Sequence, residues 1–170
     1  MQMTSAYANK MLKQLEEEKE YWTNKESESY LYTAAVDEEP VIPDYDYAEV
    51  AGKIEEIDQK VCRIKHAINL SNANATINVD GEMMSVDVIL VRMSQLNKRK
   101  AILDGMRKQL PKTRIDSGAF GARKASPEYR YINYDLELIK SEYEIVSKKI
   151  LAMQMALDKH NQTAEFELEI

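Results

Sequence analysis

The stretch from Leu110 to Tyr134 holds the side chains best suited to bind a ligand, because cations, glycines and aromatic rings are gathered there within a short segment. Between Arg107 and Arg130 seven basic residues stand against two acidic ones, Asp116 and Glu128, in a chain of net charge −6. This local excess of five positive charges is typical of a surface that binds something anionic. The stretch is therefore the leading candidate for a functional site.

The chemistry expected of this stretch is recognition of a phosphorylated, ring-bearing molecule such as a nucleotide. Arginine forks bind phosphate through paired hydrogen bonds, and glycines let backbone N–H groups approach a ligand. Aromatic rings stack on bases, which makes Tyr129 and Tyr134 further candidates for contact. The expected ligand-binding residues are Lys112, Arg114, Ser117, Gly118, Phe120, Gly121, Arg123, Lys124, Arg130 and Tyr131.

An acidic connection at about residues 26–46 has two possible relations to the basic stretch. In the first, its carboxylates pair with the arginines, within one chain or between chains, and the stretch is structural. In the second, the tyrosines of the connection complete the ligand site. The tyrosines in question are Tyr30, Tyr32, Tyr45 and Tyr47.

The sequence offers no recognisable set of catalytic residues, so we expect a protein that is not an enzyme. The basic stretch matches neither a P-loop nor a Rossmann fingerprint. Ser117 and Ser126 lack the context of an activated serine nucleophile. The histidines, His66 and His160, have no neighbouring ligands at metal spacing, and we expect neither a metal nor a cofactor.

Composition indicates one domain and a reducing, cytoplasmic setting. A chain of 170 residues with 44% hydrophobic residues is large enough for a folded core. The acidic balance argues against a nucleic acid polymer as partner. The sequence shows no secretion-signal pattern and no apolar run of ~18 residues, so we expect no membrane partner. Cys62 is the lone cysteine, so no internal disulfide forms, and its neighbours Val61 and Ile64 predict a buried thiol.

Four long helices are predicted to position the basic stretch, at about residues 4–26, 46–72, 85–110 and 135–161. The second and fourth carry apolar residues at alternating spacings of three and four, typical of left-handed coiled-coil packing. Whether these seams close within one chain or between chains is open, but helices of this length often form homo-oligomers. The two seams are Tyr47, Val50, Ile54, Ile57, Val61, Ile64 and Ile68, and Leu136, Ile139, Tyr143, Val146, Ile150, Met153 and Leu157.

Short strands are predicted at about residues 75–84, 129–134 and 163–170. The first is a hairpin about Asp80-Gly81, a favoured two-residue turn. The last alternates apolar residues with glutamates, as an edge strand does, and residues 129–134 and the Thr76–Val79 hairpin are the two candidate partners for it. Residues 111–128 are predicted as the basic loop. The expected fold is mainly α: an antiparallel, coiled-coil-like bundle of long helices, with a small β-hairpin and a C-terminal edge strand, in a single domain over residues 1–170.

The segment from Lys53 to Leu103 resembles the septicolysin-like family of small helical proteins. The likeness rests on a helix that ends in an Asn-x-x-Asn turn, at Asn69 and Asn72, then a short hairpin and a capped helix. The terminal LAMQMALDKHNQT is similar to the family's closing Gln-x-x-Asn stretch, although Gln162 stands where members have Trp. A related set shares Leu110, Pro111, Lys112, Arg114, Gly118, Ala119, Phe120 and Gly121.

The resemblance implies a helical fold and, by the family's name, a pore-forming haemolysin; it supplies no catalytic residues. Such proteins occur in bacteria and in their phages. From the residues themselves we expect a non-enzymatic homo-oligomer that binds and sequesters a small anionic, nucleotide-like ligand, as a phage sponge for a host defence signal does. The alternative is a scaffold whose basic loop is a protein interface, and the pore-former is the third hypothesis.

Overall fold

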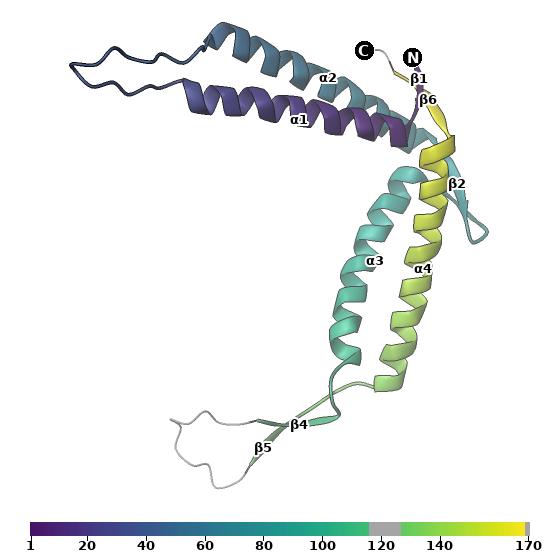
Figure 1. Cartoon of the computed structure of the whole chain (residues 1–170). Coiled ribbons are helices and arrows are strands. Elements are labelled where there is room, and N and C mark those ends of the chain that lie inside the picture. Colours follow the sequence, from purple (N-terminus) through teal and green to yellow (C-terminus); the bar gives the residue numbers. More distant parts are fainter. Residues whose placement is uncertain (116–126, 169–170) are drawn as a thin grey trace. The chain divides into compact units, whose positions relative to one another are not determined.

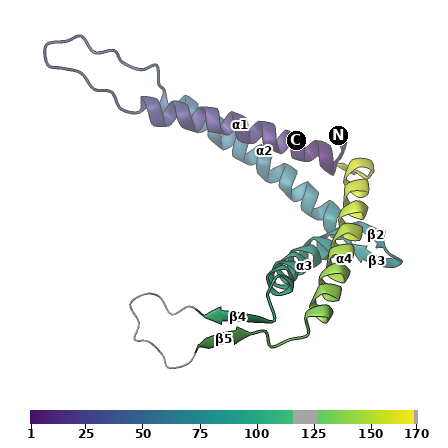
Figure 2. The same cartoon turned by 60° about the horizontal axis from the view of Figure 1, so that its bottom comes forward.

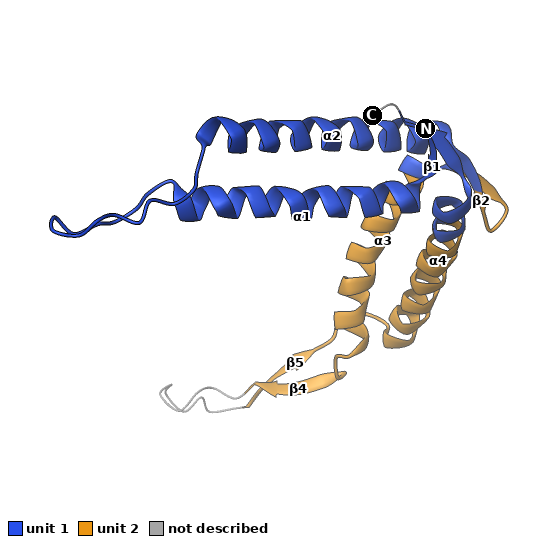
Figure 3. Cartoon of the chain, turned by 45° about the horizontal axis from the view of Figure 1, so that its top comes forward, with its two compact units in different colours: residues 1–77, 85–87, 157–170 blue, residues 78–84, 88–156 orange. Residues whose placement is uncertain are grey.

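The computed structural model describes residues 1–115 and 127–168, which divide into two compact units (Figure 3). Unit 1 consists of residues 1–77, 85–87 and 157–170, and unit 2 of residues 78–84 and 88–156. Each unit is built around a pair of long helices, and the fold is mainly α with small antiparallel strand pairs, as predicted.

Unit 1 contains helices α1, Ser5–Ser29, and α2, Tyr47–Asn74, which lie side by side and antiparallel (Figure 1). Thr4 caps α1 by accepting a hydrogen bond from the backbone N–H of Tyr7. Asp46 caps α2, because its carboxylate accepts from the N–H groups of Ala48 and Glu49. Both helix starts match the sequence prediction within one residue.

The core of the α1–α2 pair is the predicted seam of α2. Val50, Ile57 and Ile64 are at most 2% exposed and recur every seven residues. An ion pair joins the two helices at the edge of this core, where Lys19 Nζ lies 2.6 Å from a carboxylate oxygen of Asp58. Cys62 is exposed, so the prediction of a buried thiol was wrong. Val61 is partly buried, but Cys62 is the next residue of the helix and its side chain points to another side, toward solvent.

A two-stranded sheet closes the end of unit 1. Strand β1, Gln2–Thr4, pairs antiparallel with β6, Glu165–Glu167, in a register that sets Met3 opposite Phe166. The prediction that the C-terminal strand pairs with the residue 75–84 hairpin or with residues 129–134 was therefore wrong. The pairing stabilises a small core, because Met3, Ala8, Ile64 and Leu168 are buried together.

Unit 2 is built on helices α3, Val86–Arg107, and α4, Leu136–Thr163, which lie side by side in Figures 1 and 2. The last residues of α4 and the first of α3 belong to unit 1. α3 ends three residues earlier than predicted, and α4 begins after Asp135, whose carboxylate accepts from the N–H groups of Glu137 and Leu138. The buried seam of the pair is formed by Ile89, Leu96, Leu103, Ile139, Val146 and Met153.

Strands β2, Thr76–Val79, and β3, Glu82–Ser85, form the predicted hairpin about Asp80-Gly81. Both turn residues have positive φ, 50° for Asp80 and 92° for Gly81, as a type I′ turn requires. The side chain of Asn78 accepts a hydrogen bond of 2.8 Å from the N–H of Gly81 and holds the turn closed.

Candidate ligand-binding ribbon

The basic stretch forms a two-stranded antiparallel ribbon in unit 2. Strand β4, Lys112–Ile115, pairs with β5, Glu128–Tyr131, and both are drawn in Figure 2. The prediction of loop from residue 111 to residue 128 was therefore wrong at both ends. Residues 116–126, between the strands, lie outside the described residues.

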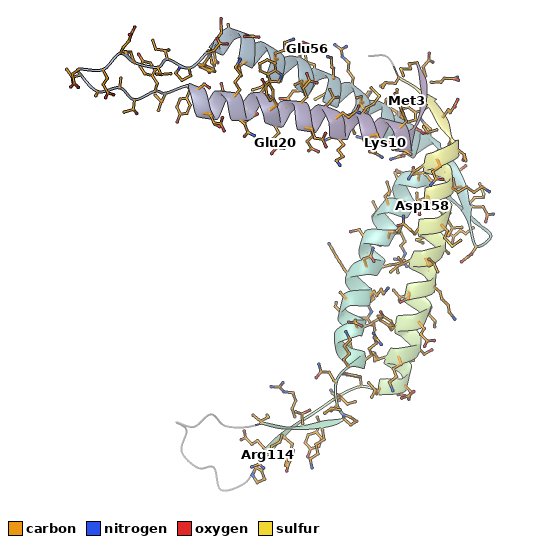
Figure 4. The ribbon with its side chains drawn as sticks, viewed as in Figure 1. Met3, Lys10, Glu20, Glu56, Arg114 and Asp158 are labelled. Atoms are coloured by element: carbon orange, nitrogen blue, oxygen red, sulfur yellow. The ribbon has the colours of Figure 1, made fainter. Side chains whose placement is uncertain are left out.

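The register of the ribbon sorts its side chains onto two faces, because directly opposed residues of an antiparallel pair point to the same side. Lys112 is opposite Tyr131, and Arg114, labelled in Figure 4, is opposite Tyr129. One face therefore carries two cations and two tyrosines. The other face carries Thr113 with Arg130, and Ile115 with Glu128.

Contacts across the first face join its cations to its rings. The ammonium nitrogen of Lys112 lies 4.0 Å from the ring centre of Tyr129 and 5.6 Å from that of Tyr131. Both distances are within the range of cation–π attraction, worth ~0.5–1 kcal/mol at an exposed site. All residues of both strands are exposed, so this face is open to a ligand.

One hydrogen bond ties the segment after the ribbon to the end of α3, and a second one joins the two segments at the base of the ribbon. The hydroxyl of Tyr134 donates to the carbonyl of Met106 at 2.7 Å, and the same carbonyl, in the last turn of α3, also accepts from the N–H of Gln109. The N–H of Ile132 donates to the carbonyl of Pro111. Tyr134, which was predicted to stack on a ligand, thus has a structural contact, and this contact holds the base of the ribbon against the end of α3.

A second group of cations gathers around Tyr143 of α4. The guanidinium carbon of Arg107 lies 4.1 Å from its ring centre and the ammonium of Lys100 5.5 Å away. Asp104 neutralises part of this charge, since its carboxylate accepts from Lys108 and from Arg107 Nε at 2.8 Å. The hydrogen bond from Lys108, followed by that from Arg107, lowers the pKa of Asp104, and the bond to Asp104 is the main cause that raises the pKa of Arg107.

The structure brings together three of the predicted ligand-binding residues, Lys112, Arg114 and Tyr131, and adds Tyr129, which sequence analysis named as a further candidate. Arg130 was predicted with them but lies on the opposite face. The cation pair on Tyr143 was missed, because Tyr143 was interpreted only as part of the helix seam. The other predicted residues lie outside the described residues: Ser117, Gly118, Phe120, Gly121, Arg123 and Lys124.

The described part of the chain shows neither a metal-binding cluster nor a membrane-spanning helix. Within residues 1–115 and 127–168, no group of three or more His, Cys, Asp or Glu side chains is arranged to hold a metal ion. Among the helices described, none combines the length and the apolarity needed to cross a membrane.

The fold and the ribbon define a class of protein made of long helical pairs that carry short antiparallel strand pairs at their ends. A crystal structure of this class, of "a functionally unknown conserved protein from Corynebacterium diphtheriae", is similar to this chain with a TM-score of 0.71. The match covers 98% of this chain and 100% of that one at 14% sequence identity, which shows a shared fold. No protein-family model matches the chain, and no curated protein does.

Proposed function

We propose that the protein is a non-enzymatic binding protein that captures a small anionic, ring-bearing ligand on the first face of the ribbon. The observation that carries the proposal is the pairing of Lys112 with Tyr131 and of Arg114 with Tyr129 on one exposed face. A phosphate group meets an ammonium and a guanidinium there, and an aromatic ring meets two tyrosines. A nucleotide combines both chemistries in one molecule.

Sequestration follows if such a protein holds its ligand without changing it. Capture then lowers the free concentration of the ligand, and a phage-encoded protein can blunt a host defence signal in this way. In this proposal the protein acts in the cytoplasm, where nucleotides are present. The likeness to the septicolysin-like family stays a prediction and contributes nothing to the proposed site.

The test is a thermal-shift screen against mono-, di- and cyclic nucleotides and ADP-ribose derivatives. A ligand at 100 times its Kd stabilises the folded protein by about 2.7 kcal/mol, which raises the melting temperature by several degrees. Lys112→Ala and Arg114→Ala are expected to remove the shift. Lys98→Ala deletes an equal charge at an exposed position of α3 and is expected to keep it.

Chromatography of the released ligand completes the test. Recovery of unchanged ligand supports capture, whereas a modified product contradicts the non-enzymatic proposal. A flat screen, or equal loss of the shift in all three variants, contradicts a ligand site on the ribbon.

A scaffold function is the second candidate, and exposed apolar side chains of the α3–α4 pair favour it. Ile102 of α3 and Leu138 and Ile145 of α4 are 56%, 57% and 43% exposed. Their heptad positions relative to the buried seam place them on one side of an antiparallel helix pair. Arg99 and Glu142 lie on the same side by the same rule and add one charge of each sign to it. Such a patch suits a homo-oligomer.

A further inference from the structure

A hollow lined by tyrosines lies in unit 1, where the last turn of α1 meets the first turn of α2. It has a volume of about 550 Å³, within the range of pockets that hold small molecules. All of its walls belong to unit 1, whereas the ribbon belongs to unit 2. Its lining residues are Thr23, Glu26, Ser27, Tyr30, Tyr45 and Tyr47.

One hydrogen bond organises the hollow. The hydroxyl of Tyr45 donates to Oε1 of Glu26 at 3.2 Å and ties the end of the connection to α1. Desolvation, with a smaller contribution from the hydrogen bond to Glu26, raises the pKa of the Tyr45 hydroxyl. Tyr30 and Tyr47 are 60% and 68% exposed, which leaves their rings available to a ligand.

The chain segment that supplies most of the lining of the hollow is acidic. Residues 26–52 contain eight carboxylates and no Lys, Arg or His. The flanking lysines have other contacts: Lys25 lies 5.4 Å from the ring centre of Trp22, and Lys53 lies 3.9 Å from a carboxylate oxygen of Glu56. A phosphorylated ligand is repelled by this field, whereas a cation is drawn into it.

We propose that this hollow is a binding site for an organic cation, namely an ammonium group on an alkyl stem. Tyrosine faces attract such a cation through their quadrupoles, and aromatic walls cover its alkyl part. Glu26 supplies the counter-charge, because a carboxylate that accepts from Tyr45 has acceptor capacity left for an ammonium N–H. The site does not depend on the ligand proposed for the ribbon, and it assigns these tyrosines to a cation, which differs from both relations considered from the sequence.

Two sources present the same chemistry. A free polyamine carries alkylammonium groups in solution, and a lysine side chain carries one on a polypeptide, including the basic ribbon of a second copy. The two sources are distinguished by comparing the affinities of two compounds: spermidine represents a free polyamine, and Nα-acetyl-lysine methylamide represents a lysine side chain. n-Butylammonium is the minimal probe, since it has one charge and cannot bridge distant carboxylates.

The experiment is calorimetric titration of the full chain with each of these probes. We expect saturable binding of n-butylammonium and about a tenfold loss in Glu26→Gln, since a lost charge pairing of ~1.4 kcal/mol corresponds to that factor. Glu20→Gln is the matched control, because Glu20 is an exposed glutamate of α1 outside the hollow (Figure 4). It is expected to bind as the wild type does.

A second pair of variants tests the rings. Tyr47→Ala is expected to weaken n-butylammonium binding by about 2–30-fold, as loss of a cation–π partner worth ~0.5–2 kcal/mol does. Tyr7→Ala removes an exposed tyrosine elsewhere on α1 and is expected to have no effect. Circular dichroism verifies that each variant is folded.

Three results would overturn the proposal. The first is equal weakening in Glu26→Gln and Glu20→Gln, which would reveal general attraction to an acidic protein. The second is binding of neutral 1-butanol as tightly as n-butylammonium. The third is unaltered binding in a folded Tyr47→Ala variant.

Discussion

Lys112 and Tyr129 stand on neighbouring strands with the ammonium nitrogen 4.0 Å from the ring centre, so the cation covers one face of the ring and the ring of a ligand can stack only on the other face. This contact fixes a flexible side chain before any ligand arrives, and preorganisation of this kind lowers the entropy cost of binding. The ribbon thus presents charge and ring as one unit.

Removal of that ring is the first prediction. Tyr129→Ala is expected to weaken binding of a nucleotide-like ligand by ~1–3 kcal/mol, the usual contribution of one stacked base. Titration calorimetry measures the loss. Tyr21→Ala, at an exposed tyrosine of α1, should bind like the wild type. Equal affinities of all three proteins would show that Tyr129 makes no contact with the ligand.

Two glycines are expected to respond to alanine with opposite signs. Gly81 has φ of 92°, where an L side chain is strained, so Gly81→Ala should destabilise the protein by ~1–3 kcal/mol. Gly52 lies within α2 and has open space where the methyl group of an alanine would stand, so Gly52→Ala should stabilise it by ~0.5–1 kcal/mol. Urea unfolding measures both; an unchanged or raised stability of Gly81→Ala would contradict the assigned turn, and a lowered stability of Gly52→Ala would contradict the open space in α2.

Asp104 is expected to make stability depend on acid pH. The hydrogen bonds from Lys108 and Arg107 lower its pKa below the ordinary 3.8, so the unfolded state takes up its proton first as pH falls. The stabilisation is present at neutral pH and is lost as pH falls through the native pKa. Asp104→Asn should therefore melt below the wild type at pH 7, with a gap that closes below pH 3.8.

Melting curves recorded by circular dichroism at several pH values between about 2.5 and 7 measure this gap. The range extends to both sides of ~4, the ordinary pKa of an aspartate. Asp37→Asn, in the exposed connection of unit 1, provides the control and should melt with the wild type throughout. A gap in Asp104→Asn that persists unchanged to the lowest pH would mean that the carboxylate contributes by packing and not by charge.

Self-association through the α3–α4 pair is the fourth prediction. Ile145→Glu buries a carboxylate in the proposed interface, which should raise the dimer dissociation constant by at least about tenfold, since an unpaired buried charge costs more than ~1.4 kcal/mol. Leu151→Glu places the same charge on another exposed edge of α4 and should leave the constant unchanged. Sedimentation equilibrium distinguishes these outcomes, and a monomeric wild type would contradict the interface.

Helix positions were predictable because heptad spacing and caps are local signals. The seam through Val50, Ile57 and Ile64 is visible in the sequence and is the buried seam of α2. The pairing of Met3 with Phe166 was not predictable in the same way, because a three-residue strand at one end of the chain has no local mark of a partner at the other. Strand β1 forms because it pairs with β6, which is a contact between distant parts of the sequence.

The ribbon was predictable in composition and not in geometry. The excess of cations and rings identified Lys112, Arg114 and Tyr131, yet the register alone separates Arg130 from them. Register depends on how two strands meet, and a shift by one residue exchanges the two faces. Likewise, the sequence left open whether the tyrosines of the acidic connection complete the ligand site, and the structure adds one contact there, the hydrogen bond from Tyr45 to Glu26.

The run of residues 26–52 without a basic side chain has a consequence for the protein in concentrated solution. Positive charge is concentrated in residues 107–131, so the acidic and the basic side chains lie in different segments of the chain. Segments of opposite charge on different copies attract one another. Molecules of net charge −6 repel on average, but patch attraction favours a negative osmotic second virial coefficient at low ionic strength. Added salt screens that attraction over a Debye length of ~8 Å at 0.15 M, so light scattering should show the coefficient rise with salt.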